Sequence, residues 1–109
     1  MKAKLSALDL LFPKVRAEIL RILLSEPRKQ RYVRELMLMS GLALRTVQEE
    51  LATLTVLGMV TSWSNGYHRF YRANRDHSLF APLLAIVRES ARLPESTIPA
   101  HRRKRRPKS

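Results

Sequence analysis

The spacing of apolar residues predicts a helical body with one pair of strands. Over residues 13–25 and 44–57, apolar side chains recur every three or four positions, which is typical of helices that bury one face. A helix of about two turns begins at Val33 and ends at Gly41, a residue whose backbone freedom suits a sharp corner. After Gly58 the apolar spacing changes to alternation, so strands are expected to follow.

A β-hairpin is predicted for the segment that follows Gly58. Residues 59–64 and 67–73 are rich in strand-forming types and flank the dipeptide Asn65-Gly66. This dipeptide favours a two-residue type I′ turn, because both central residues then have positive φ. In the resulting register Trp63 lies opposite His68. The more apolar face of this hairpin, which we expect to pack on the core, carries Met59, Thr61, Trp63 and Phe70.

Both ends of the chain carry further apolar helical patterns. Residues 3–11 have leucines at helical spacing, and a helix from Leu79 to about Arg92 is apolar around more than half its circumference. A monomer would leave part of this surface exposed, so we expect a homodimer, although a terminal helix folded over its own core is the alternative. The residues predicted to form the dimer interface are Leu5, Leu8, Leu79, Phe80, Leu83, Leu84 and Val87.

Charge and composition narrow the range of partners. The 109 residues carry a formal net charge of +12, from 21 Lys and Arg against nine Asp and Glu. Six of the basic residues lie between Arg102 and Lys108, which leaves 15 against nine, or +6, for the rest. This excess favours nucleic acid or an anionic membrane surface as the partner. We expect one domain over residues 1–92 and a basic, disordered tail over 93–109.

Several classes of protein are disfavoured by what the sequence lacks. There is no cysteine, which removes disulfides and thiolate metal sites. No apolar run approaches the roughly 18 residues that a membrane span needs, so we expect a cytoplasmic protein without a membrane partner. The histidines are scattered, and neither a Gly-rich phosphate loop nor a nucleophile motif is present. We therefore expect no enzyme activity, no metal site and no cofactor.

The order of helices, corner and hairpin is carried by a series of short sequences. They are 32–36 (YVREL), 40–42 (SGL), 46–51 (TVQEEL), 57–60 (LGMV) and 70–74 (FYRAN), followed by Asp76-His77 and Leu79-Phe80. Together they resemble the ArsR-type winged helix-turn-helix regulators of bacteria and archaea, over roughly residues 10 to 90. Within that family they look most like small regulators that are sometimes fused or adjacent to nucleotidyltransferase domains. The resemblance implies a mainly α fold with a β-hairpin wing, here with additional terminal helices.

The resemblance also implies a dimer that binds double-stranded DNA, with helix 44–57 in the major groove and wing 59–73 over the backbone or minor groove. This chain departs from the family at Glu49, where many relatives carry a basic residue, and it lacks the Cys or His/Asp clusters of the metal-sensing members. A carboxylate there repels phosphate, yet it can accept a hydrogen bond from a cytosine amino group.

Helix 44–57 has a polar face suited to reading bases. Winding it at about 100° per residue places Arg45, Gln48 and Glu49 opposite the apolar stripe. Arg and Gln pair bidentately with guanine and adenine, and Thr46 is better placed for a phosphate. The alternatives are a merely solvated helix face, and a wing tip in which Tyr67 and His68 only pack across the strands. The predicted DNA-binding residues are Arg45, Thr46, Gln48, Glu49 and Thr53 of the helix, with Tyr67, His68, Arg69 and Arg72 of the wing.

The sequence thus favours a sequence-specific, homodimeric transcriptional regulator that acts as a repressor by occupying promoter DNA. The alternative is an adaptor module with a protein partner such as a nucleotidyltransferase, in which the outward Val56 contributes to the contact. A third interpretation is a nonspecific nucleoid-type protein that relies on its basic tail.

Overall fold

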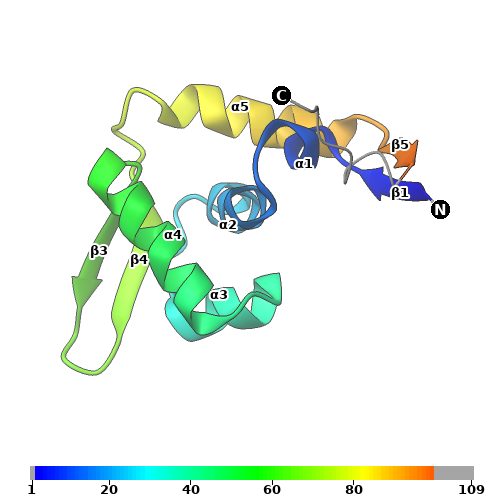
Figure 1. Ribbon diagram of the computed structural model, residues 1–109. Coiled ribbons are helices and arrows are strands. Elements are labelled where there is room, and N and C mark those ends of the chain that lie inside the picture. The colour runs from blue at the N-terminus through cyan, green and yellow to red at the C-terminus, as the bar shows by residue number, and fades with distance from the viewer. Residues whose placement is uncertain (1, 100–109) are drawn as a thin grey trace, which may run out of the picture.

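Helix α2 (Lys14–Ser25) lies at the centre of the computed structural model, which describes residues 2–99 (Figure 1). Helix α5 (Phe80–Arg92) lies on one side of α2, and helix α3 (Val33–Ser40) lies on the other. The other elements are β1 (Lys2–Leu5), α1 (Ala7–Leu11), β2 (Arg31–Tyr32), α4 (Leu44–Leu57), β3 (Val60–Ser64), β4 (Arg69–Ala73) and β5 (Ser96–Pro99).

The core forms around α2, because six of its twelve residues are buried. Leu23 of α2, Leu36 of α3 and Leu51 of α4 belong to one buried cluster. Burial of these residues removes apolar surface from water and holds the helices against one another. The helices predicted over residues 13–25 and 44–57 are confirmed within one residue at their ends.

The N-terminal segment differs from the single helix that its leucine spacing suggests. Strand β1 ends at Leu5, and α1 begins only after the N-cap residue Ser6. The Ser6 hydroxyl accepts a hydrogen bond from the Asp9 N–H at 3.2 Å, while the Asp9 carboxylate accepts one from the Ser6 N–H at 3.1 Å. This reciprocal capping box fixes the start of the helix, so Leu5 lies outside it.

Strands β1 and β5 join the two ends of the described chain. They pair antiparallel, with Lys2 opposite Pro99 and Leu5 opposite Ser96. The predicted tail over residues 93–109 therefore contains a paired strand in its first part, which corrects the predicted boundary. The remaining residues, 100–109, include the basic segment and lie outside the described residues.

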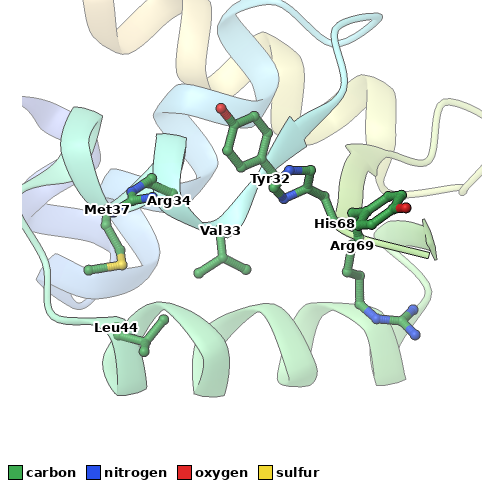
Figure 2. A pocket seen from close by; sticks show the side chains of 8 residues that line it. Tyr32, Val33, Arg34, Met37, Leu44, His68 and Arg69 are labelled. Carbon is green, nitrogen blue, oxygen red and sulfur yellow. The ribbon is translucent and has the colours of Figure 1, made fainter. Parts of the chain in front are cut away.

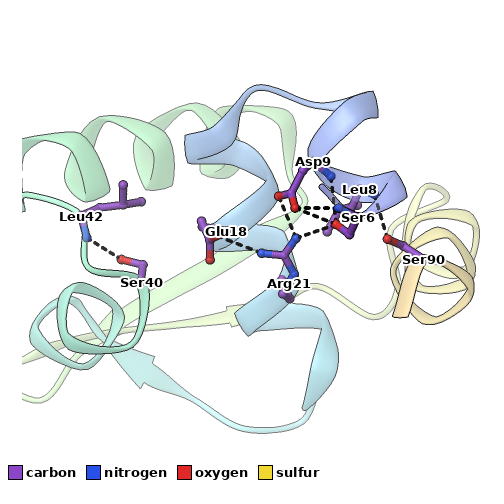
Figure 3. Close-up of polar contacts among 8 residues, drawn as sticks. All are labelled: Ser6, Leu8, Asp9, Glu18, Arg21, Ser40, Leu42 and Ser90. Atoms are coloured by element: carbon purple, nitrogen blue, oxygen red, sulfur yellow. Dashed lines mark hydrogen bonds and ion pairs between the residues drawn. The ribbon is translucent and has the colours of Figure 1, made fainter. Parts of the chain in front are cut away.

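A polar cluster fastens α1 to its neighbours (Figure 3). Arg21 of α2 donates to the Asp9 carboxylate at 3.0 Å and forms a second ion pair with Glu18 at 3.0 Å. On the other side, the buried Ser90 hydroxyl accepts from the Leu8 N–H at 2.8 Å. Burial opposes ionisation of Asp9, but the hydrogen bonds from Arg21 and Ser6 outweigh it and hold the pKa of its carboxyl below the ordinary 3.8.

This shift predicts a contribution of Asp9 to stability that acid removes. A carboxyl whose pKa is lower in the folded than in the unfolded chain stabilises the fold above its unfolded pKa, and the effect disappears as the pH falls through the folded pKa. We expect Asp9→Asn to lower the free energy of unfolding at pH 7, and to lower it by less at pH 3, which lies below the ordinary carboxyl pKa of 3.8. Urea unfolding at both pH values measures this, and an equal loss at both would show that the carboxylate charge is not responsible.

The hairpin register differs from the predicted one. Trp63 lies opposite Phe70, and the loop has four residues, 65–68, instead of two. Among the described residues only glycines have positive φ, so Asn65 is not in the type I′ conformation, while Gly66 has φ +98°. The Asn65 side-chain oxygen instead accepts from the N–H groups two and three positions later, at 2.9 and 2.8 Å. This side-chain turn explains the longer loop.

The core-facing side of the hairpin was also predicted wrongly. Strand β4 lies between β2 and β3, and the buried side of this sheet carries Val60 and Ala73, with Tyr71 packed against the core. Alternation of side chains places the other set on the opposite, outer face. Of the residues expected in the core, Met59 is buried before β3 begins, whereas Thr61 is exposed and Trp63 and Phe70 are half-buried on the outer face.

His77 links the end of α4 to the start of α5. Its Nδ1 accepts from the Leu79 N–H at 3.0 Å, so the neutral ring carries its proton on Nε2, which donates to the Leu57 carbonyl at 3.0 Å. Gly58, at φ +90°, lets the chain turn beneath this ring, because a Cβ there would lie 3.2 Å from the imidazole. The C-terminus of α4 is thereby held against the connection to α5.

Candidate nucleic-acid interface

Helix α4 exposes the polar face that the sequence predicts. Arg45, Gln48 and Glu49 are exposed, while Val47 and Leu51 are buried in the core. Helix α5 packs against α2 and α1, on the opposite side of α2 from α3, and leaves this face of α4 open (Figure 1). The helix therefore presents a guanidinium, an amide and a carboxylate along one open surface.

Two positions of α4 depart from its predicted apolar stripe. The helical spacing puts Leu44 on the same side as Val47 and Leu51, but Leu44 is 47% exposed at the start of the helix. Glu50 is buried instead, and its carboxylate accepts from Nε of Arg16 in α2 at 2.6 Å. Hydrogen bonding to Glu50 raises the pKa of the Arg16 guanidinium above its ordinary value, so Arg16 keeps its charge at neutral pH. This pair connects the inner side of α4 to α2.

The two threonines among the predicted DNA-binding residues lie in different surroundings. Thr46 is half-buried near the helix start, and Thr53 is exposed but donates its hydroxyl to the Glu49 carbonyl at 3.1 Å. Thr53 also lines an apolar depression of about 230 Å³ beside Leu79 of the α5 connection. It therefore lies toward the α5 side of the helix, away from the wing.

A second concave surface lies between the wing and the start of α4 (Figure 2). It is an open depression of about 410 Å³, and Figure 2 shows Val33 pointing toward α4 on one side, with Tyr32 beside His68 on the other. Tyr67, at the wing tip, is 91% exposed. The lining residues are Tyr32, Val33, Arg34, Met37, Leu44, Tyr67, His68 and Arg69.

The structure brings three of the predicted wing residues, Tyr67, His68 and Arg69, into this depression and places Arg72 outside it. Arg72 lies over the Trp63 ring, with its guanidinium carbon 5.2 Å from the ring centroid. Arg34 joins the depression although the sequence did not single it out. Its position beside Tyr32 within the family-like sequence at 32–36 was the available signal.

Four arginines around α4 and the wing form no ion pair with a carboxylate of the described residues. Within residues 2–99, no ion pair engages Arg34, Arg45, Arg69 or Arg72, and Arg69 donates only to the Ser62 hydroxyl at 3.2 Å. Glu49 is the single carboxylate among the predicted contact residues. Unpaired guanidinium groups beside an exposed helix suit a phosphate backbone.

The described part of the chain offers little for other chemistries. Among residues 2–99, no three His, Asp or Glu side chains come together as a metal-binding group. In the same range, no helix is both long enough and apolar enough to cross a bilayer.

Helix α3, the Gly41 corner, α4 and the hairpin of β3 and β4, paired with β2, make this a winged helix-turn-helix fold. The chain is similar in structure to a possible transcriptional regulator from Methanosarcina mazei Go1, with a TM-score of 0.57 and 18% identity over 76% of this chain and 72% of that one. It is also similar to a MarR family transcriptional regulator from Silicibacter pomeroyi DSS-3, with a TM-score of 0.60 and 17% identity over 88% of this chain and 61% of that one.

No family model matches the chain, and neither does any curated protein. At these identities the similar structures confirm the winged-helix fold expected from the sequence. The narrower ArsR-type assignment stays a prediction.

Proposed function

We propose that this protein is a sequence-specific transcriptional regulator that binds double-stranded DNA. The observation that carries the proposal is the open polar face of α4 beside a cationic depression formed with the wing. The similar structures, which are described as transcriptional regulators, support it through their shared fold.

In this proposal α4 enters the major groove, whose width of about 12 Å admits a helix. Arg45 and Gln48 contact base edges, and Glu49 accepts from cytosine where the site offers one. The wing follows the backbone, with Arg69 and Arg34 on phosphates and Tyr67 at the minor groove. Repression then follows from occupation of the promoter.

Selection of bound duplexes from a random pool tests this proposal. A regulator of this kind enriches a defined sequence, and a two-fold symmetric arrangement gives a palindrome with half-sites about 34 Å apart. Salt-titrated affinities for the selected and for random duplexes should then differ by about a thousandfold or more. A ratio near one would indicate a nonspecific nucleoid-type protein, and an absence of binding would remove DNA as the partner.

The proposal includes a homodimer, and fewer of the residues predicted for its interface are available than the sequence suggested. Leu8 and Val87 are buried in the core of this chain and offer no surface to a second copy. Phe80, Leu83 and Leu84 are half-buried against the core, and Leu5 is half-buried beside α1. The exposed leucines of α1 and of the two residues that flank α5 are Leu10, Leu11, Leu79 and Leu93, and these are available to a partner chain.

Charged substitutions on this surface should produce monomers. Leu11 and Leu79 are 64% and 42% exposed, so lysine at both is accommodated by the monomer but disfavoured in an apolar interface. We expect sedimentation at micromolar concentration to show a dimer for the unmodified protein and a monomer for the double variant. The matched control is Leu38→Lys on α3, at a residue that is 79% exposed. A monomeric unmodified protein, on and off DNA, would contradict the dimer.

A second candidate function rests on the apolar residues of the helix-turn-helix itself. Val56 on α4 is 89% exposed, and Leu38 on α3 is also largely exposed. Apolar side chains on the outside of such helices suit a protein partner, as in the adaptor alternative. Failure to enrich any duplex, with retention of a protein partner that Val56→Asp abolishes, would favour this function.

A further inference from the structure

The outer face of the three-stranded sheet carries a row of aromatic rings that the proposed duplex contacts leave unused. Tyr32 of β2 lies opposite Phe70 of β4, which lies opposite Trp63 of β3. The ring centroids are 5.9 and 5.8 Å apart along this row. Because neighbouring strands lie about 4.8 Å apart, the row crosses the whole sheet.

Two polar side chains complete this surface. The His68 ring lies 5.1 Å from Tyr32, and the Arg72 guanidinium carbon lies 5.2 Å from the Trp63 centroid. Both polar residues are exposed, while the three rings of the row are half-buried. We call these five residues, Tyr32, Trp63, His68, Phe70 and Arg72, the aromatic face. It contains no carboxylate, so it carries positive charge beside its rings.

The aromatic face is continuous with the cationic depression, because Tyr32 and His68 line both. Arg34 lines the same depression as Tyr32 and therefore lies near one end of the row, and Arg72 lies at the other. Arg69 alternates with Phe70 along β4 and bonds to Ser62, so it lies on the opposite face of the sheet. An occupant complementary to this surface has several flat aromatic groups joined by anionic links. Unpaired nucleotides have this chemistry, whereas a duplex hides the faces of its bases in the stack.

We infer that the aromatic face binds single-stranded nucleic acid. Bases stack on the row of Phe70, Trp63 and Tyr32, and phosphates pair with the arginines at its two ends. Stacking on aromatic side chains tolerates any base, so this binding has little sequence preference. The surface is distinct from the α4 residues proposed to read duplex DNA, and it gives the protein a second nucleic-acid ligand.

The single tryptophan of the chain makes binding directly measurable, because Trp63 belongs to the row. Titration of the full-length protein with oligothymidylate or oligouridylate of about 12 nucleotides should quench its fluorescence to saturation. The two oligomers distinguish DNA from RNA as the preferred strand. An abasic strand of equal length, which keeps the phosphates and lacks the bases, should bind at least tenfold more weakly.

Substitutions in the aromatic face distinguish a loss of base stacking from a loss of folding. Anisotropy of a labelled oligothymidylate should show a loss of about tenfold or more for Phe70→Leu, and near-normal binding for Phe70→Tyr, which restores a ring. Arg72→Gln keeps the rings and should lower the slope of log affinity against log salt by about 0.7. Thermal unfolding identifies any variant that fails to fold, in which case Tyr32→Leu replaces it. Arg45→Ala is the matched control and should leave single-strand binding unchanged.

Three results would each overturn the inference: no binding of either oligomer, equal binding of the abasic strand, or undiminished binding by a folded Phe70→Leu variant. Failure of the proposed function gives a different pattern. There, selection enriches no duplex while the oligothymidylate still binds through Phe70.

Discussion

Replacement of both Arg45 and Gln48 by alanine is expected to lower affinity for the selected duplex by about thirtyfold or more, because each bidentate base contact contributes about 1–3 kcal/mol of discrimination. Random DNA should lose less than about tenfold, since only the phosphate attraction of one guanidinium is removed there. Both side chains are exposed, so the fold should be unaffected. Affinities for both duplexes at one fixed salt concentration measure the difference.

The matched control for this pair is Arg28→Ala with Gln30→Ala. Both residues are exposed, and their substitution also removes one guanidinium and one amide. They lie in the connection between α2 and β2. The control should reduce both affinities slightly and equally. Equal losses on selected and random duplexes for the Arg45 and Gln48 pair would rule out base reading by these two side chains.

The helices of this fold could be predicted from the sequence because their apolar residues recur at a regular helical spacing. Residues 44–57 follow the 3.6-residue pattern, and Gly41 and Gly58 mark the two ends where left-handed backbone is required. These local signals agree with the tertiary fold, so they identify the order of elements without knowledge of any contact.

The hairpin shows where local signals are insufficient. Asn65-Gly66 correctly placed a turn, but the Asn65 side chain bonds to the loop backbone and lengthens the loop by two residues. A register change of two residues leaves every side chain on the same face of the sheet. The core-facing side was predicted wrongly for another reason, because it was chosen by its apolar content. Trp63 and Phe70 satisfy that criterion by packing against each other outside the core. The sequence does not reveal that β2 extends the sheet and adds Tyr32 to this group.

The candidate interface was also predictable only in part. The exposed positions Arg45, Gln48 and Glu49 follow from helical period alone. Arg34 enters the cationic depression through the packing of α3 beside the wing, a long-range contact for which the family-like sequence at 32–36 was the one available signal. The helical pattern does not identify Glu50 as a buried residue, because its partner Arg16 lies 34 positions earlier in the chain.

The ion pair between Arg16 and Glu50 leads to the second large expected effect. Arg16→Ala leaves the Glu50 carboxylate, whose side chain is 9% exposed, without its partner. We expect the free energy of unfolding to fall by about 1–3 kcal/mol, below the value for a fully buried pair because Arg16 itself is 37% exposed. Urea unfolding at pH 7 measures the loss, which should also loosen the attachment of α4.

A double variant distinguishes the destabilising effect of an unpaired buried charge from that of lost packing. Arg16→Met combined with Glu50→Leu removes both charges and keeps apolar volume, so its stability should return to within about 1 kcal/mol of the unmodified protein. Its affinity for the selected duplex should return as well, because the outward residues of α4 are unchanged and the helix is again held in place. If the double variant regains stability but not affinity, the ion pair has a second role. It then sets the rotation of α4 in the groove, in addition to holding the helix against α2. If the double variant is no more stable than Arg16→Ala, the cost lies in packing around Arg16, and the carboxylate is not the reason that the single variant is destabilised.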